Sequence, residues 1–138
     1  MGQRVVPFLG YEDAAAAIEW LERAFGFIED RDARYEEDDT ITHAELDVGG
    51  ATIYLSTPRG YASPRRLRET SDLARRAYDN PWVIDGQFVE VDDLYAHYDR
   101  ARSAGATILR EPEDPGIGQR IYSAEDLEGH RWMFGQKP

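Results

Sequence analysis

The chain has 138 residues, no cysteine, 27 acidic and 16 basic residues, and a net charge of −11 at pH 7. This length suits one domain with a real core. The absence of cysteine excludes disulfides, thiolate metal sites, iron–sulfur clusters and cysteine nucleophiles. The negative charge argues against nucleic acid or an anionic membrane as a partner and favours cationic ligands. No segment has the roughly 18 apolar residues of a membrane span. The N-terminus lacks a signal-peptide pattern, so we expect a cytoplasmic protein.

The first elements are a short apolar strand and an amphipathic helix. The strand "FLGYED" ends in acidic residues, and Asp13 is placed to accept hydrogen bonds from the free N–H groups of the helix that follows. Apolar residues recur at helical spacing through "EDAAAAIEWLERAFGF", and Gly26 ends the pattern. The next segment, 28–47, carries nine acidic residues and two arginines. A glycine turn and a β-rich strand follow in "AELDVGGATIYL".

A connector and a second copy of this pattern complete the chain. Residues 59–81 include Pro64 and "DLARRAY", which predict a loop and one short helix, in which Leu67, Leu73 and Tyr78 need a surface to pack on. We expect the connector arginines to pair with the acidic 28–47 segment or with a partner subunit. "FVEVDD" leads into the helix pattern "DDLYAHYDRARSAGA", and "AEDLEGHRWMF" matches "AELDVGGATIYL" at a similar offset. The sequence therefore predicts a single α+β domain, 1–138, of two βαβββ modules at about 1–58 and 82–136.

Three stretches that span most of the chain resemble the vicinal oxygen chelate superfamily, which includes glyoxalase, bleomycin resistance proteins and dioxygenases. They are "VPFLGYEDAAAAIEWLERAFGF", "VEVDDLYAHYDRARSAGATILREPED" and "YSAEDLEGHRWMF". The resemblance implies two curved sheets that form a cup, with the helices outside and a cavity lined by the concave faces. It also implies an arrangement that is often completed in a homodimer.

Enzymes of this superfamily usually hold a divalent metal with four His, Glu or Gln side chains, two from each module. The positions that match here are Val6, Tyr54, Gly86 and Met133, and a shift by one residue recovers only Gln87. These side chains are poor donors for a hard divalent ion. We therefore expect no metal and no cofactor, which puts the metal-dependent activities of the superfamily in doubt.

The alternation of side chains along strands predicts which residues line the cavity. Tyr54 and Met133 at the former ligand positions face inward, whereas Ile53, Leu55, Trp132 and Phe134 face the helices. Val5, Leu9, Val89 and Val91 are likewise expected to face the helices. Trp82 could cap the cup, although core or dimer packing is an alternative. The candidate ligand-binding residues are Phe8, Tyr54, Phe88, Glu90, Arg131, Met133 and Trp82.

The charged candidates and the three histidines each have a structural interpretation beside a functional one. Glu90 and Arg131 could pair with each other or reach solvent, or Glu90 could bind a cation or act as a general base. His43 is either a partly exposed sheet residue or a second candidate base. His130, after Gly129, is interpreted as a structural turn residue and His97 as a residue at the helix border. The three histidines have no spacing typical of a zinc site.

These observations leave three functional hypotheses. The first is a metal-free protein that binds and sequesters a small cationic or aromatic compound such as an antibiotic, as the bleomycin-resistance branch does. The second is a lyase- or isomerase-type enzyme that uses Glu90 or His43 as its base, with or without a divalent metal. The third is a regulatory module whose cavity is only core. The expected partners are a small organic ligand and a second copy of the chain.

Overall fold

The computed structural model describes residues 2–79 and 86–138, which form two helix-bearing modules of α+β type, as expected. The first module contains β1 (Phe8–Gly10), α1 (Ala14–Phe25), β2 (Ile28–Glu29), the 3-10 turn η1 (Arg31–Ala33), β3 (Tyr35–Glu37), β4 (Thr40–Val48) and β5 (Ala51–Ser56). The second contains β6 (Gln87–Glu90), α4 (Leu94–Ser103), β7 (Thr107–Glu113), β8 (Arg120–Glu125) and β9 (Arg131–Gln136). The connector carries α2 (Pro64–Thr70) and α3 (Asp72–Tyr78). Within the described ranges, no helix is long and apolar enough to cross a membrane.

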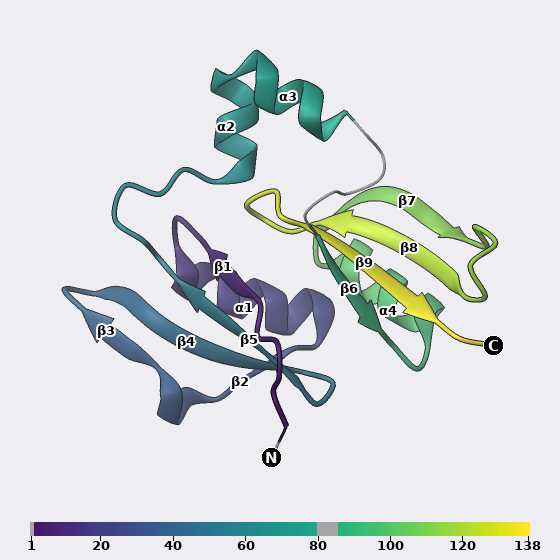
Figure 1. Cartoon of the computed structure of the whole chain (residues 1–138), viewed down its shortest axis with the longest axis horizontal. Coiled ribbons are helices and arrows are strands. Elements are labelled where there is room, and N and C mark those ends of the chain that lie inside the picture. Colours follow the sequence, from purple (N-terminus) through teal and green to yellow (C-terminus); the bar gives the residue numbers. More distant parts are fainter. Residues whose placement is uncertain (1, 80–85) are drawn as a thin grey trace.

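Each module builds its own sheet. The strand order is β1-β5-β4-β2 in the first sheet, where β3 also pairs with β4, and β6-β9-β8-β7 in the second. The leading strand of each sheet is parallel to its neighbour, and the other pairs are antiparallel. The sheets lie next to each other with β1 and β6 at the centre, and α1 and α4 lie behind them in contact with each other (Figure 1). This arrangement is the predicted cup with its helices outside.

Local sequence signals fix where the two long helices begin and end. Asp13 accepts a hydrogen bond from the Ala16 backbone N–H at 3.0 Å, and Asp93 accepts one from Ala96 at 3.1 Å. Gly26 ends α1 with a φ of 76°, a left-handed conformation that favours glycine. The buried face of α1 is formed by Ala14, Ala17, Ile18, Trp20, Leu21, Ala24 and Phe25.

One hydrophobic core runs through both modules. The ring of Phe25, at the end of α1, lies 5.7 Å from Trp132 and 4.8 Å from Phe134, centre to centre. The expected helix-facing side chains Ile53, Leu55, Trp132 and Phe134 are all buried. Val5 was predicted wrongly: it is 92% exposed because β1 begins only at Phe8.

The turn before the last strand fastens the second module to the first. Asp126 is 1% exposed and accepts hydrogen bonds from the Tyr11 hydroxyl at 2.6 Å and the Trp132 indole N–H at 3.0 Å. Glu128 accepts hydrogen bonds from the backbone N–H groups of Glu12 and Asp13, just before α1. His130 Nε2 lies 2.6 Å from the Gly10 carbonyl oxygen, which also ties the two modules together.

The connector departs from its prediction in three respects. It has two short helices, and Pro64 starts the first of them. Proline is favoured there because the N–H group that it lacks would have no partner within the helix. Leu67 and Leu73 are 43% and 71% exposed and do not pack into the core. In the part of the chain that the structure describes, no connector arginine pairs with the acidic 28–47 segment, and the predicted alternative, a partner subunit, stays a prediction. Arg66 pairs with Glu12 at 2.7 Å, and Arg68 pairs with Glu125 through two hydrogen bonds of 2.7 and 2.8 Å.

Candidate functional site

Four rings form a continuous strip on the face of the first sheet that is turned away from α1; we call Phe8, Tyr35, His43 and Tyr54 the aromatic strip. Phe8 is aligned with Tyr54 in the pairing of β1 with β5, and their ring centres are 5.7 Å apart, edge to face. The His43 ring lies 4.8 Å from Tyr54 and 6.2 Å from Tyr35. Phe8 and Tyr35 are 68% and 63% exposed. Rings with an open face at these separations can stack on a planar ligand.

A carboxylate lies within the same strip. Strand β4 alternates between the core and the concave face, so His43 and Glu45 project on the same side as Tyr54. His43 Nε2 lies 2.9 Å from a Glu45 carboxylate oxygen, and both side chains are between a quarter and a third exposed. Glu45 is also aligned with Tyr54 across the pairing of β4 with β5. The strip therefore combines a hydrogen-bonded imidazole–carboxylate pair with aromatic surface.

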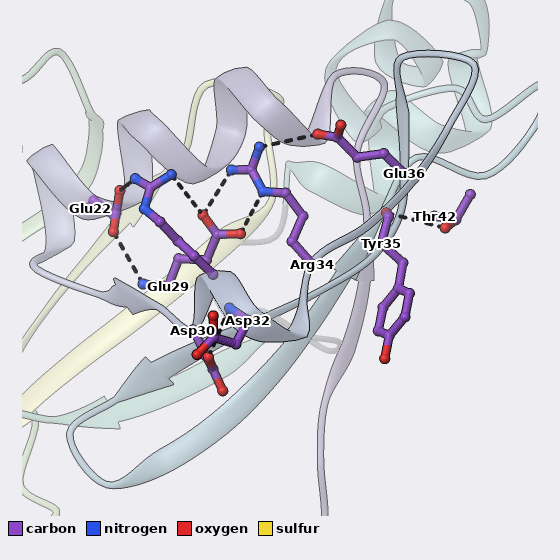
Figure 2. Close-up of polar contacts among 9 residues, drawn as sticks. Glu22, Glu29, Asp30, Asp32, Arg34, Tyr35, Glu36 and Thr42 are labelled. Atoms are coloured by element: carbon purple, nitrogen blue, oxygen red, sulfur yellow. Dashed lines mark hydrogen bonds and ion pairs between the residues drawn. The ribbon is translucent and has the colours of Figure 1, made fainter.

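A row of ion pairs lies beside the start of β3, and the Tyr35 ring points away from it (Figure 2). Glu29 has a fully buried side chain and accepts two hydrogen bonds from Arg34, at 2.7 and 2.8 Å. These hydrogen bonds, with burial opposing them, hold the pKa of the Arg34 guanidinium above its ordinary value. Thr42 donates a hydrogen bond from its hydroxyl to the Tyr35 carbonyl at 3.2 Å. Arg34 precedes Tyr35 directly, so the buried pair fixes the start of β3 and with it the ring above His43.

The face of the second sheet carries the other predicted cavity residues. Phe88 is aligned with Met133 in the pairing of β6 with β9 and is 44% exposed, and their role as cavity lining stays a prediction. Glu90 is exposed and lies 3.7 Å from Lys137. Arg131 is 8% exposed, 3.8 Å from Glu125, and its guanidinium lies over the Tyr78 ring. Burial lowers the pKa of Arg131, while Glu125 opposes that effect.

A pocket of about 430 Å³ joins the two modules where β1 ends and β6 begins. Its lining residues are Phe8, Leu9, Gly10, Tyr61, Gly86, Gln87, His130 and Arg131. Phe8 thus belongs to both the aromatic strip and this pocket. The burial of Tyr61 is the main cause that raises the pKa of its phenol to about 12. Trp82, the remaining ligand-binding candidate, lies outside the described residues.

Sequence reasoning missed two members of this site, Tyr35 and Glu45. Alternation in "THAELDV" was available as a signal for Glu45, because it places residues 43, 45 and 47 on one face. Tyr35 lies on a three-residue strand whose pairing with β4 shifts register after its first residue. Short irregular strands of this kind carry little periodicity, so no sequence signal pointed to this ring.

The side chains at the metal-ligand positions of the superfamily do not suit a hard divalent ion. Val6 and Gly86 offer no donor, Met133 offers a thioether, and Tyr54 offers a phenol within the aromatic strip. Across residues 2–79 and 86–138, no group of three or more histidines, aspartates or glutamates has an arrangement that could hold a metal ion. The described donor set therefore does not fit the metal that this fold holds in its enzymes.

The family profile of the Glyoxalase/Bleomycin resistance protein/Dioxygenase superfamily matches residues 4–134. The chain belongs to this superfamily. An uncharacterised superfamily relative, Mb0911c from Mycobacterium bovis, is 31% identical over 130 residues, which are 94% of this chain and 80% of the relative. The protein Rv0887c of Mycobacterium tuberculosis is also 31% identical over 130 residues, 94% of this chain and 72% of its own length.

Two solved structures are similar in fold to this chain. TioX from a Micromonospora species is 31% identical, with a TM-score of 0.71 over 99% of this chain and 97% of TioX. The fosfomycin resistance protein FosX of Listeria monocytogenes has a TM-score of 0.66 over 100% of this chain and 95% of its own, at 9% identity. FosX is therefore similar in fold alone, whereas TioX is similar in both fold and sequence.

Proposed function

We propose that this protein binds a small planar aromatic compound on the concave face of its first sheet and does so without a metal ion. The observation that carries the proposal is the aromatic strip. Its four rings follow one another at centre separations between 4.8 and 6.2 Å, and its two outer rings are mostly exposed. Ligand sites in proteins are commonly apolar surfaces with a few polar anchors. Glu45 and the neighbouring pocket with Gln87 and Arg131 offer such anchors.

Sequestration of a drug in the cytoplasm, as in the bleomycin-resistance branch, would need binding alone. Membership of the superfamily supports this proposal without naming the compound, since the superfamily also contains enzymes. The ill-fitting metal donors favour a binder over the metal-dependent enzymes of the superfamily. Phe88 and Met133 on the second sheet are proposed to line the opposite wall of the same cup.

A neutral planar probe tests this proposal. Coumarin is uncharged and bicyclic, and its binding can be followed by amide shifts in a ¹H–¹⁵N spectrum and by calorimetry. We expect shifts in β1, β4 and β5, and about a 3- to 10-fold loss of affinity in Tyr54→Ala, since one stacked ring contributes about 0.5–1.5 kcal/mol. Tyr95→Ala is the matched control, because Tyr95 is an exposed tyrosine on α4 that contacts Arg120. Shifts confined to other elements, or an unchanged affinity in Tyr54→Ala, would contradict the proposal.

A second candidate function is proton transfer by His43. The Glu45 carboxylate holds one ring nitrogen of His43, which leaves the other nitrogen able to take a proton from a bound carbon acid. Glu90 is the weaker base candidate, because its carboxylate is exposed beside Lys137. Deuterium exchange from solvent into small carbonyl compounds, followed by NMR, tests this function. An enzyme of this kind should lose about 10²–10⁴-fold in exchange rate in His43→Gln.

We also propose that two copies of the chain associate. Phe8, Tyr35 and Phe88 are large apolar side chains with 68%, 63% and 44% exposure. A second copy that covers the rim of the cup would shield part of this surface, with an interface above about 1,000 Å². Sedimentation equilibrium at micromolar concentration should give the mass of a dimer, and a monomer there would refute the proposal.

A further inference from the structure

The structure assigns the Glu45 carboxylate as the counter-charge for an organic cation seated on the aromatic strip, and His43, once protonated, as an internal competitor for that carboxylate. This inference rests on the proposed binding function and specifies the charge and pH dependence of the ligand. It differs from the sequence-based hypothesis, in which Glu90 bound the cation. Three features support it: the rings of the strip, the Glu45 carboxylate beside His43, and the charges around them.

The rings provide the first part of a cation site. The faces of aromatic side chains attract a positive charge that lies within about 6 Å of the ring centre. Tyr54 has Phe8 on one side and His43 on the other, with edge-to-face contacts to both. Tyr35 extends the strip beyond His43. A flat cation laid on this surface would contact Tyr54 and reach the Glu45 side chain, which is aligned with Tyr54 on the next strand.

The carboxylate provides the second part, and its charge depends on its neighbour. With a neutral imidazole, the pair of His43 and Glu45 carries one negative charge, and this charge is available to a ligand cation. With a protonated imidazole, the 2.9 Å contact becomes an internal ion pair with no net charge. A protonated imidazole and a ligand cation compete for the same carboxylate. Cation binding should therefore strengthen as the imidazole loses its proton with rising pH, and weaken as the pH falls.

Two other charged groups lie near the pair, one of each sign. Asp47 lies two residues beyond Glu45 on the same face of β4 and accepts a hydrogen bond from the Gly50 N–H. Its carboxylate adds negative charge to this face of the sheet. Arg4 reaches the Thr52 hydroxyl at 3.4 Å, two residues from Tyr54 along β5. From β3 and β5 the rings of Tyr35 and Tyr54 contact the His43 ring. Glu45 is thus the carboxylate in contact with His43, and the overall charge of −11 also attracts a cation.

The experiment compares 1-methylquinolinium, a planar cation, with uncharged coumarin by calorimetry from about pH 5 to 8. At the upper end of this pH range we expect the cation to bind the wild type about 3- to 10-fold more tightly than coumarin. At the lower end of the range we expect the two probes to bind equally well. In two buffers with different ionisation enthalpies, cation binding should release protons near the midpoint of this change. Coumarin binding should not.

Three variants make the assignment specific. His43→Gln keeps a hydrogen-bond donor beside Glu45 but cannot become charged, so its preference for the cation should no longer depend on pH. Glu45→Gln should remove the preference at every pH while coumarin still binds. Glu19→Gln, an exposed carboxylate on α1, is the control and should behave like the wild type. Far-UV circular dichroism checks that each variant is folded.

The outcomes separate this inference from the proposed function. A pH-independent preference in the wild type would overturn the role of His43, and so would a loss of binding at low pH that persists in His43→Gln. A preference that survives Glu45→Gln but disappears in Glu90→Gln would move the counter-charge to the second sheet and refute the assignment. Coumarin binding with no preference for the cation would refute the inference alone. Failure of both probes to bind would refute the proposed function.

Discussion

Replacement of Asp126 tests how strongly one buried carboxylate holds the two modules together. Four donors point at this side chain: the Tyr11 hydroxyl at 2.6 Å, the Trp132 indole N–H at 3.0 Å, and the backbone N–H groups of Glu128 and His130, both at 3.0 Å. Each oxygen of the carboxylate accepts two of these hydrogen bonds, so all four donors depend on this one side chain. Burial and the nearby Asp126 raise the pKa of Tyr11, so that its phenol stays a donor.

The magnitude follows from the donors left behind. Tyr11 is fully buried, Trp132 likewise, and each unsatisfied buried donor costs about 1–3 kcal/mol. Asp126→Ala should therefore destabilise the fold by about 3–5 kcal/mol, which lowers the melting temperature by roughly 10–20 °C for a domain of this size. Asp126→Asn keeps the shape of the side chain but turns an NH₂ group toward two of the donors. We expect it to destabilise the fold by about 2–4 kcal/mol.

Urea denaturation followed by circular dichroism measures these changes, with Asp99→Asn as the control, since Asp99 is an exposed carboxylate on α4. Tyr11→Phe alone should cost about 1–2 kcal/mol, and its combination with Asp126→Asn should cost less than the sum, because both changes remove the same hydrogen bond. A midpoint for Asp126→Asn that matches the wild type would refute the reasoning. Full additivity with Tyr11→Phe would refute it as well.

Three further predictions concern the core, the ion pairs and pH. Trp132→Ala should cost about 3–5 kcal/mol in urea unfolding, because the residue is fully buried, whereas Phe88→Ala should cost less than about 1.5 kcal/mol, because its ring is 44% exposed. Arg34→Met should cost about 2–4 kcal/mol in the same assay, because it strands the buried Glu29 carboxylate; Arg31→Met should stay within about 0.5 kcal/mol, because Arg31 is 70% exposed and 3.7 Å from Glu29. Burial lowers the pKa of His97 below 6.5, because it disfavours the charged imidazole. The stability that the neutral His97 contributes is therefore complete above pH 6.5 and is lost as the pH falls through the lowered pKa of the folded state. The urea midpoint should therefore fall more between pH 7.5 and 5.5 in the wild type than in His97→Gln, and equal decreases would show that another group dominates.

Helix and strand patterns made most of this fold predictable. The apolar face of α1, the caps Asp13 and Asp93, and the alternation around Trp132 depend on residues close together in sequence. Sequence periodicity records such local requirements directly. The inward and outward assignment of Tyr54 and Trp132 followed from alternation once the strand was located.

The partners of charged side chains were not predictable in the same way. The connector arginines were expected to reach the acidic 28–47 segment or a partner subunit, yet Arg68 pairs with Glu125, 57 residues along the chain. A long arginine side chain pairs with whichever carboxylate the tertiary fold brings near, and sequence charge counts carry no such distance information. Likewise His97 was expected only at a helix border. It lies between the Phe25 carbonyl at 3.0 Å and the Tyr122 hydroxyl at 2.5 Å, which joins α4 to elements of both modules.

The aromatic strip also explains why loss of the metal donors need not mean loss of a site. In the first sheet, Tyr54 takes the place where relatives would supply a metal ligand, and its ring is bracketed by Phe8 and His43. A metal site fixes a ligand through a few strong directional bonds, whereas rings fix it through area and orientation. Under the proposed function, such a face would accept different planar compounds and gain selectivity mainly from charge, which Glu45 beside His43 would provide. The chemistry of this cup is therefore expected to depend on pH and ligand charge, where that of its metal-bearing relatives depends on coordination.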